Sequence, residues 1–392
     1  KIDRQTKLLA MRNIGPFFLL TVACLPVLAA GIGDPFDTDA MAPLKPSPQL
    51  SARVGAAPCA TAIPATALTA LDAVDLALCN HPQTREVWAS ARVQAALLGV
   101  AKAGWLPNLD GSASATRFQY DDARFNRRTA ALTLSWLLVD FGQRSANVEN
   151  AQQLLNAAAA TQDATVQSLF LAALQTYYSA QATQAAVISA SEAERSARES
   201  YQAADARYNV GVATPADRLQ AQTALSQATL NRFRAEGEAR NALGALANAL
   251  GFPAQQTIVL AAMPAMPAEL AFQKEIDALI AEAQVRRPDL KAAEAQFKAA
   301  EASVDLARAQ GRPTVSLAAG PSGQNSAGAV TQGGSIGLTL NVPLFSGFDT
   351  TYRVRSAAAQ ADVRAAQRDR IRNQIALDVW KSYQSLTTAT QS

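Results

Sequence analysis

Histidine, charged side chains and aromatic side chains are scarce in this chain of 392 residues. It contains one histidine, His81, with 17% charged residues, a net charge of +3 and 6% aromatic residues. A lone histidine without a partner for proton transfer argues against acid–base catalysis, and lysines and arginines do not cluster as a nucleic-acid surface requires. No zinc-ligand spacing, phosphate-binding loop or nucleophile elbow occurs. We therefore expect no enzyme activity, no metal, no cofactor and no nucleic-acid partner.

Alanine is abundant, and the chain repeats itself at an offset of about 206 residues. The matches are Pro82 with Pro288, Pro107 with Pro313, residues 101–103 with 307–309, and residues 132–134 with 338–340. After a one-residue slip, Gly142, Gln162 and Tyr178 recur as Gly347, Gln367 and Tyr383. The sequence therefore predicts an internal duplication, with two halves on one plan and many closely packed helices.

Residues 1–30 have the pattern of a secretory signal peptide. Lys7 and Arg12 precede an apolar segment, residues 17–28, that is too short to span a bilayer comfortably, and small residues follow as a cleavage site. Met11 is a candidate start, which would place residues 1–10 upstream of the true N-terminus. Cys24 leaves a lipoprotein signal as an alternative, but we favour ordinary cleavage and expect an exported protein.

Residues 31–66 form a leader rich in proline and alanine, which cannot bury enough apolar surface to become ordered. Cys59, in this leader, and Cys79 both remain after cleavage of the signal. In an oxidising compartment these two cysteines can form a disulfide that pins the leader, and two unpaired thiols are the alternative. The sequence thus predicts a loose leader with one candidate cross-link.

The segment between Gly142 and Gly211 contains neither glycine nor proline, so nothing obliges a helix to end there. Such a helix extends about 100 Å, with a coiled-coil seam at spacings of four and three. The seam residues are Val166, Phe170, Ala173, Tyr177, Ala180 and Val187. Beyond Gly211, Thr214-Pro215 and Asp217 have the pattern of a capping box that starts a returning helix. We therefore predict a long antiparallel helical hairpin.

Each half also contains two strand-like runs in which apolar and polar residues alternate. The apolar positions are Leu132, Leu134, Trp136 and Leu138 in the first half, and Ile336, Leu338, Leu340, Val342 and Leu344 in the second. Alternation over about ten residues suits a transmembrane barrel strand, and a soluble sheet with one solvated face has the same pattern. We predict four transmembrane strands, because no helical domain is available to cover them. The polar stretches 120–128 and 322–334 are expected to be external loops.

Both halves are predicted to follow the same order of elements behind a signal peptide: a helix, two strands, a long helix, a turn and a returning helix. This order resembles that of the TolC family of outer-membrane export channels. The most specific match is the segment 207–217, Arg-Tyr-Asn-Val-Gly-Val-Ala-Thr-Pro-Ala-Asp, which looks like the periplasmic tip between the family's long helices. Leu106-Pro107 before a strand and residues 344–347 after one are supporting matches. The cysteine pair and the segment 77–82, Ala-Leu-Cys-Asn-His-Pro, suggest the branch found with type I secretion systems.

The resemblance implies an α+β membrane protein with long antiparallel coiled-coil hairpins and four strands per chain, which three copies pool into one β-barrel. The barrel would lie in the lipid of a Gram-negative outer membrane, with the helices extending into the periplasm. In this family a periplasmic adaptor (membrane fusion) protein docks on the tips, and an inner-membrane ABC or proton-driven pump supplies the cargo. The implied function is a passive exit duct for protein secretion or efflux. The alternative is a periplasmic coiled-coil adaptor or structural bundle.

Expected site residues follow from the same match. The tip positions that meet the adaptor in the family are Val210, Gly211, Val212 and Thr214, and Asp217 falls where a carboxylate constricts the closed pore. Gly211 can instead serve only a tight turn, and Asp217 can serve only as a helix cap. Arg207 and Tyr208 are expected to be packing and tip contacts.

The repeat divides the chain into a first channel repeat at 67–253, a connector at 254–270 and a second repeat at 271–392. A helix is expected over about residues 271–308, interrupted at Arg287-Pro288 as His81-Pro82 interrupts the first half. The counterpart of the first tip falls beyond Ser392, so we expect the second repeat to be truncated within its long helix.

Overall fold

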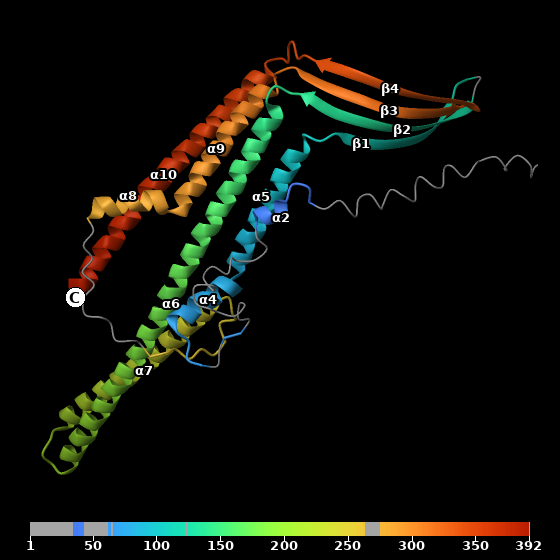
Figure 1. The fold of residues 1–392 in the computed structure, drawn as a ribbon. Helices are drawn as coiled ribbons and strands as arrows, with labels where there is room; N and C mark the ends of the chain where they lie inside the picture. Colours follow the sequence, from blue (N-terminus) through green and yellow to red (C-terminus); the bar gives the residue numbers. More distant parts are fainter. Residues whose placement is uncertain (1–33, 43–61, 64–65, 122–123, 263–274, 392) are drawn as a thin grey trace, which may run out of the picture.

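The computed structural model describes residues 34–42, 62–63, 66–121, 124–262 and 275–391. The predicted signal peptide, Cys24, Cys59 and most of the leader lie outside these described residues. Figure 1 shows an elongated molecule in which long helices carry a curved sheet at one end, and a helical hairpin projects at the other. The two ends are therefore separated by the length of the helices.

The first half forms its helices from segments that begin at capped positions. They are α4 (Ala70–Asn80), α5 (Pro82–Ala103), α6 (Gln143–Asn209) and α7 (Pro215–Ala249). Thr69 and Thr214 each form a capping box, and Pro82 and Pro215 occupy the first helical turn, where a backbone N–H has no partner to lose. Helix α6 has 67 residues and extends about 100 Å. The predicted long hairpin is confirmed.

The second half repeats this plan with α8 (Ile276–Arg286), α9 (Pro288–Ala309) and α10 (Asp349–Gln391). His81 and Arg287, each directly before a proline, have extended backbones and separate the first helix of each half from the second. Helix α9 packs against α6 and α10, and α6 packs along α7. The predicted interruption at Arg287-Pro288 and the internal duplication are thus visible in the fold.

One four-stranded antiparallel sheet joins the two halves in the order β1-β2-β3-β4. Its strands are β1 (Asn108–Gln119), β2 (Arg124–Val139), β3 (Thr314–Ser326) and β4 (Ala329–Asn341). The register places Trp136, Leu317 and Leu338 side by side, so the predicted alternation gives the sheet one apolar face. Within the described residues no strand lies beside the outer edges of β1 and β4, and the sheet is open on both sides.

The prediction that residues 120–128 and 322–334 form external loops is wrong, because most of these residues belong to the strands. Residues 124–128 continue β2 and pair with residues 115–119 of β1. Strands β3 and β4 likewise extend to a two-residue turn at Ala327 and Gly328. Both turn residues have positive φ, which matches the twist of a tight hairpin. Polar side chains on both faces hid these strand ends from a reading of hydrophobic alternation.

The apolar run at the other end of β4 is longer than the strand itself. Strand β4 ends at Asn341, so Val342 and Leu344 lie beyond it. Pro343 explains the end, because proline donates no hydrogen bond to a ladder and restricts the residue before it. The remaining apolar residues of the run, from Ile336 to Leu340, stay on the strand and are exposed.

The largest buried cluster lies where α4, α6 and α7 meet. It includes Leu68, Val74, Leu246 and Leu250 together with seam residues of α6. Of the predicted seam, Ala173, Tyr177 and Ala180 are buried, whereas Phe170 is 39% exposed and Leu169 is buried in its place. The Tyr177 hydroxyl donates to the Leu68 carbonyl at 2.9 Å, so this buried polar atom has a partner.

A second cluster joins α5 and α6, and part of the leader contributes to it. Helix α2 (Thr38–Met41) packs against α5, and Ala42 is buried beside Ala91, Ala95 and Leu98. Asp34 holds α2 in place, since its carboxylate accepts hydrogen bonds from the Thr38 hydroxyl and the Asp39 amide. The leader, which was expected to be loose, is therefore packed at residues 34–42.

Candidate functional site

The turn between α6 and α7 is closed by backbone hydrogen bonds. The Val212 N–H donates to the Arg207 carbonyl at 2.9 Å, and the Gly211 N–H donates to the Tyr208 carbonyl at 2.9 Å. This pair of bonds satisfies carbonyls at the end of α6 and requires a left-handed residue, which is Gly211 at φ 81°. The turn role of Gly211 is therefore structural, whatever else it contacts.

The first turn of α7 is held by a reciprocal cap. The Thr214 hydroxyl accepts from the Asp217 amide at 3.2 Å, and Asp217 Oδ2 accepts from the Thr214 hydroxyl at 2.7 Å and from its amide at 2.9 Å. The hydrogen bond from the Thr214 side chain, followed by the one from its backbone, holds the pKa of Asp217 below its ordinary value. Asp217 is thus an ionised cap, and a pore role remains a prediction.

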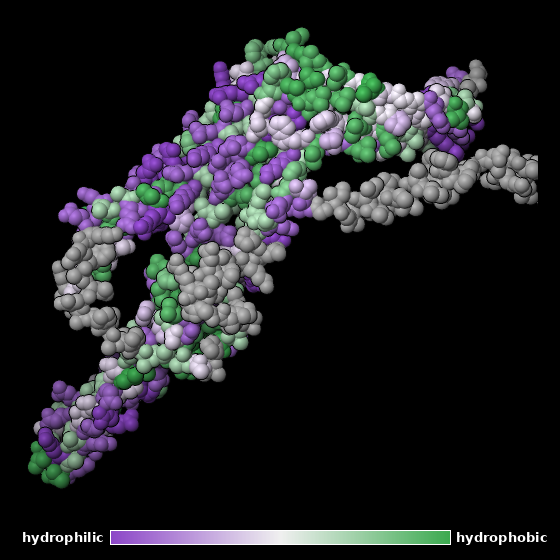
Figure 2. Space-filling view, viewed as in Figure 1, coloured by the Kyte–Doolittle hydropathy of each residue, from purple (hydrophilic) through white to green (hydrophobic). Residues whose placement is uncertain are grey.

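Exposed apolar side chains occupy the end of the hairpin. Val210 and Val212 are each 73% exposed, and they flank Gly211. Figure 2 shows the hydrophobic colour gathered at this end, below a largely hydrophilic hairpin. The structure therefore brings the predicted docking residues together on one small projecting surface, while Arg207 and Tyr208 lie on the last turn of α6 behind it.

An ion pair behind the tip joins the two helices of the hairpin. Arg218 Nε on α7 lies 2.7 Å from Asp205 Oδ1 on α6, and its guanidinium carbon is 5.3 Å from the centre of the Tyr208 ring. Asn209 Nδ2 donates to the other Asp205 oxygen at 3.2 Å. Tyr208 thus packs against Arg218, a neighbour that was not identified from the sequence, and its role as a tip contact stays a prediction.

A buried carboxylate fixes the two helices further from the tip. Glu194 on α6 is 6% exposed and pairs with Arg232 on α7, with Arg198 Nη2 at 2.6 Å and with the Thr229 hydroxyl at 3.1 Å. Arg232 also pairs with Glu236. The hydrogen bond from the Arg232 side chain holds the pKa of Glu194 below its ordinary value. Because a buried charge must keep its partner, this pair favours one register of the hairpin.

A second buried pair connects the sheet to α6. Asp140 Oδ2 accepts from Arg144 Nε at 2.8 Å, and the other guanidinium nitrogens donate to the Leu137 and Leu138 carbonyls at 2.6 and 3.1 Å. The Arg144 guanidinium carbon lies 4.2 Å from the centre of the Trp105 ring. Arg144 therefore caps the end of β2 and fixes the angle at which α6 leaves the sheet.

Two further properties bear on the kind of site. Throughout the described ranges, no helix is long and apolar enough to cross a membrane, and no three potential metal-ligating side chains gather in one place. Cys79 is disulfide-bonded. Its predicted partner, Cys59, lies outside the described residues, so that pairing stays a prediction.

These features define a class of protein: a channel subunit whose open-edged apolar sheet and long helices need further copies to close. Comparison with known proteins agrees. Residues 73–252 and 279–392 match the family model described as outer membrane efflux protein. The outer-membrane channel OprN, a solved structure, has a TM-score of 0.70 at 23% identity, covering 81% of this chain and 73% of that one.

Two curated relatives show the same likeness in sequence. Protein CyaE of Bordetella pertussis is 35% identical over 336 residues, which cover 83% of this chain and 70% of that protein. Nodulation protein T of Rhizobium leguminosarum bv. trifolii is 27% identical over 285 residues, which cover 69% of this chain and 60% of that protein. The chain therefore spans somewhat under two thirds of the second relative.

The chain belongs to the outer membrane efflux protein family, which is the TolC family that the sequence resembles. It is thus an outer-membrane channel component of tripartite export systems, and the predicted fold, function and location are confirmed. Family and fold are those of channels rather than enzymes. Such channels are trimers that work with a periplasmic adaptor and an inner-membrane pump.

Proposed function

We propose that this chain serves as the passive exit duct of a type I secretion system. The proposal rests on one observation: the same subunit has a sheet with open edges and an apolar face, and a hairpin whose end is apolar and exposed. The segment 77–82 supports the type I branch, since it holds the disulfide-bonded Cys79 in the sequence that the resemblance singles out. The repeats at 67–253 and 271–392, joined by 254–270, are then the two channel-forming units.

The open sheet edges explain why several copies are needed. Backbone N–H and C=O groups along the outer edges of β1 and β4 have no strand partner within the described chain. Lipid cannot satisfy such groups, so the edges must pair with strands of other subunits. Pairing β1 of one copy with β4 of the next satisfies both edges, turning the apolar face to lipid and the polar face to the lumen.

The hairpin end has two proposed roles in this duct. Val210, Gly211, Val212 and Thr214 form the surface on which a periplasmic adaptor docks, because apolar side chains exposed at a projecting end gain most from burial. Asp217 adds negative charge near the pore while it caps α7. One carboxylate can do both, since only its Oδ2 is engaged by Thr214.

Cross-linking from the tip tests the partners. A photoreactive residue in place of Val210 is expected to capture an adaptor in cells, and purification of that complex is expected to bring down an ABC transporter. Val285, equally exposed at 74% but on α8, is the matched control and is expected to capture neither. Recovery of a proton-driven pump would contradict the type I branch, and capture of an adaptor only from Val285 would contradict the docking role of the tip.

A further inference from the structure

The outward face of the sheet ends in arginines at the side away from the helices. On β2 the apolar residues at even positions from 132 to 136 point outward, and Arg124 and Arg128 share their face because side chains alternate along a strand. Register sets Arg117 of β1 opposite Asn126, between those two arginines and on the same face. All three are exposed. We call Arg117, Arg124 and Arg128 the arginine patch.

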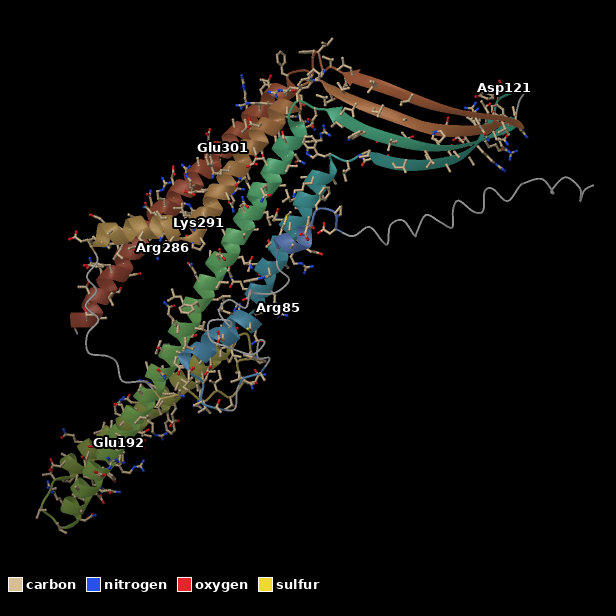
Figure 3. The ribbon with its side chains drawn as sticks, viewed as in Figure 1. Arg85, Asp121, Glu192, Arg286, Lys291 and Glu301 are labelled. Carbon is tan, nitrogen blue, oxygen red and sulfur yellow. The ribbon has the colours of Figure 1, made fainter. Side chains whose placement is uncertain are left out.

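The arginine patch has no acidic partner among the described residues. None of the ion pairs found there involves any of the three guanidinium groups. Asp121 lies at the same end of the sheet (Figure 3) and takes part in none of the ion pairs found among the described residues. Figure 2 shows this end of the sheet as a hydrophilic cap beyond a paler and greener band. The three positive charges are therefore available to an external anion.

Arg127, on the same strand but the opposite face, behaves differently. Its guanidinium carbon lies 4.7 Å from the centre of the Phe118 ring and 5.9 Å from that of Phe125. These two rings stack on each other and on Tyr120. Arg127 is thus engaged in packing on the opposite face, whereas none of the ring contacts found among the described residues involves Arg117, Arg124 or Arg128.

Strand geometry sets the level of the patch in the membrane. Trp136, whose indole Nε1 donates to the Trp105 carbonyl at 3.0 Å, lies near the helix end of the apolar band, with exposed Leu138 two residues nearer the helices. Arg128 lies about 27 Å further along the strand, or about 20 Å along the axis of a barrel whose strands tilt by about 40°. Arg124 lies roughly 10 Å beyond it. Because the apolar band of such barrels is about 25 Å tall, the patch spans its outer boundary.

We propose that the arginine patch binds the phosphate groups of anionic lipids in the outer leaflet. Guanidinium groups bind phosphate oxygens in pairs, and three of them on adjacent strands can share one headgroup or hold two. Their long stems lie along the apolar face while the charges reach the headgroup level. The sidedness rests on the proposed function, which places the helices in the periplasm and this end of the sheet outside.

Lipid titration of the purified protein tests the proposal. Phosphatidylglycerol and, as the neutral reference, phosphatidylcholine are added to protein in neutral detergent, and bound lipid is counted by native mass spectrometry. One arginine near an anionic surface contributes about fivefold in affinity at low salt. The R117Q/R124Q/R128Q variant is therefore expected to bind phosphatidylglycerol on the order of 100-fold more weakly, with binding of phosphatidylcholine unchanged.

Matched variants separate this site from general charge effects. Arg127→Gln removes one positive charge from the same strand and is expected to keep wild-type lipid affinity, and replacing all three patch residues by lysine is expected to lose only part of it. Equal phosphatidylglycerol binding by wild type and triple glutamine variant, or an equal loss in Arg127→Gln, would overturn the proposal. Conductance in phosphatidylcholine bilayers tests the two proposals separately. A wild-type protein that does not conduct would contradict the exit-duct function. A protein that conducts, but whose phosphatidylglycerol binding is the same in wild type and triple glutamine variant, would contradict lipid binding by the arginine patch.

Discussion

Replacing the two tip valines is expected to weaken adaptor docking without disturbing the fold. Val→Ala removes two methyl groups, each of which contributes about 0.8 kcal/mol when buried. Val210 and Val212 are each 73% exposed, so about three quarters of that gain is still available to a partner. For the pair this is about 2 kcal/mol, or roughly 30-fold in Kd for one tip.

The assay is titration of the purified periplasmic adaptor against the wild type and the V210A/V212A variant by calorimetry. Val285→Ala, on α8 at 74% exposure, removes the same two methyl groups elsewhere and is expected to leave Kd unchanged. Thermal unfolding of all three proteins is expected to coincide, because none of these methyl groups is buried in the subunit. A Kd within twofold of wild type for V210A/V212A, or an equal loss in Val285→Ala, would refute the docking surface.

Three further predictions concern the hairpin and the core. Asp217→Ala is expected to raise conductance in planar bilayers. The control, Thr214→Ala, removes the cap at a cost of about 1 kcal/mol in stability but keeps the charge of Asp217. If Asp217→Ala only lowers stability and conducts like the wild type, Asp217 is a helix cap alone. Because the folded pKa of Glu194 lies below its ordinary value of 4.5, its stabilising contribution is complete above that pH and is lost as the pH falls through the folded pKa. Melting curves of Glu194→Gln should therefore differ from wild type near neutral pH and converge in acid, and a difference that is constant across pH would contradict the ion pair. Leu246→Ala, at a fully buried site, is expected to cost about 2–5 kcal/mol in urea unfolding, whereas Leu219→Ala, at an exposed site on the same helix, is expected to cost under about 0.5 kcal/mol.

Local signals made much of the helical structure predictable from the sequence. Glycine and proline are absent from the segment that forms α6, and the capping box at Thr214 indicates where α7 begins. Because the two halves repeat each other, the helix break at His81 also predicted the corresponding break at Arg287. The predicted coiled-coil seam of α6 was wrong by one residue at one position, since Phe170 fits the spacing but Leu169 is the buried residue. A helix alone does not tell which of two adjacent apolar residues faces its neighbour.

Contacts that join distant segments could not be read from the sequence. Glu194 and Arg232 meet only because the hairpin folds back on itself, and Arg144 binds backbone carbonyls, which have no residue-type signature. Arg117 joins Arg124 and Arg128 through strand register, although the sequence separates it from them by a turn.

Conductance of the purified protein in planar bilayers is the decisive test of whether this chain forms a channel. The open edges of β1 and β4 and the apolar face of the sheet predict that the protein inserts as a trimer and gives stable single-channel currents. The cross-linked trimer on a denaturing gel should account for the conducting fraction. Protein that partitions into the aqueous phase after membrane fractionation, and gives no current at any voltage, would contradict the conclusion that the chain forms an outer-membrane channel.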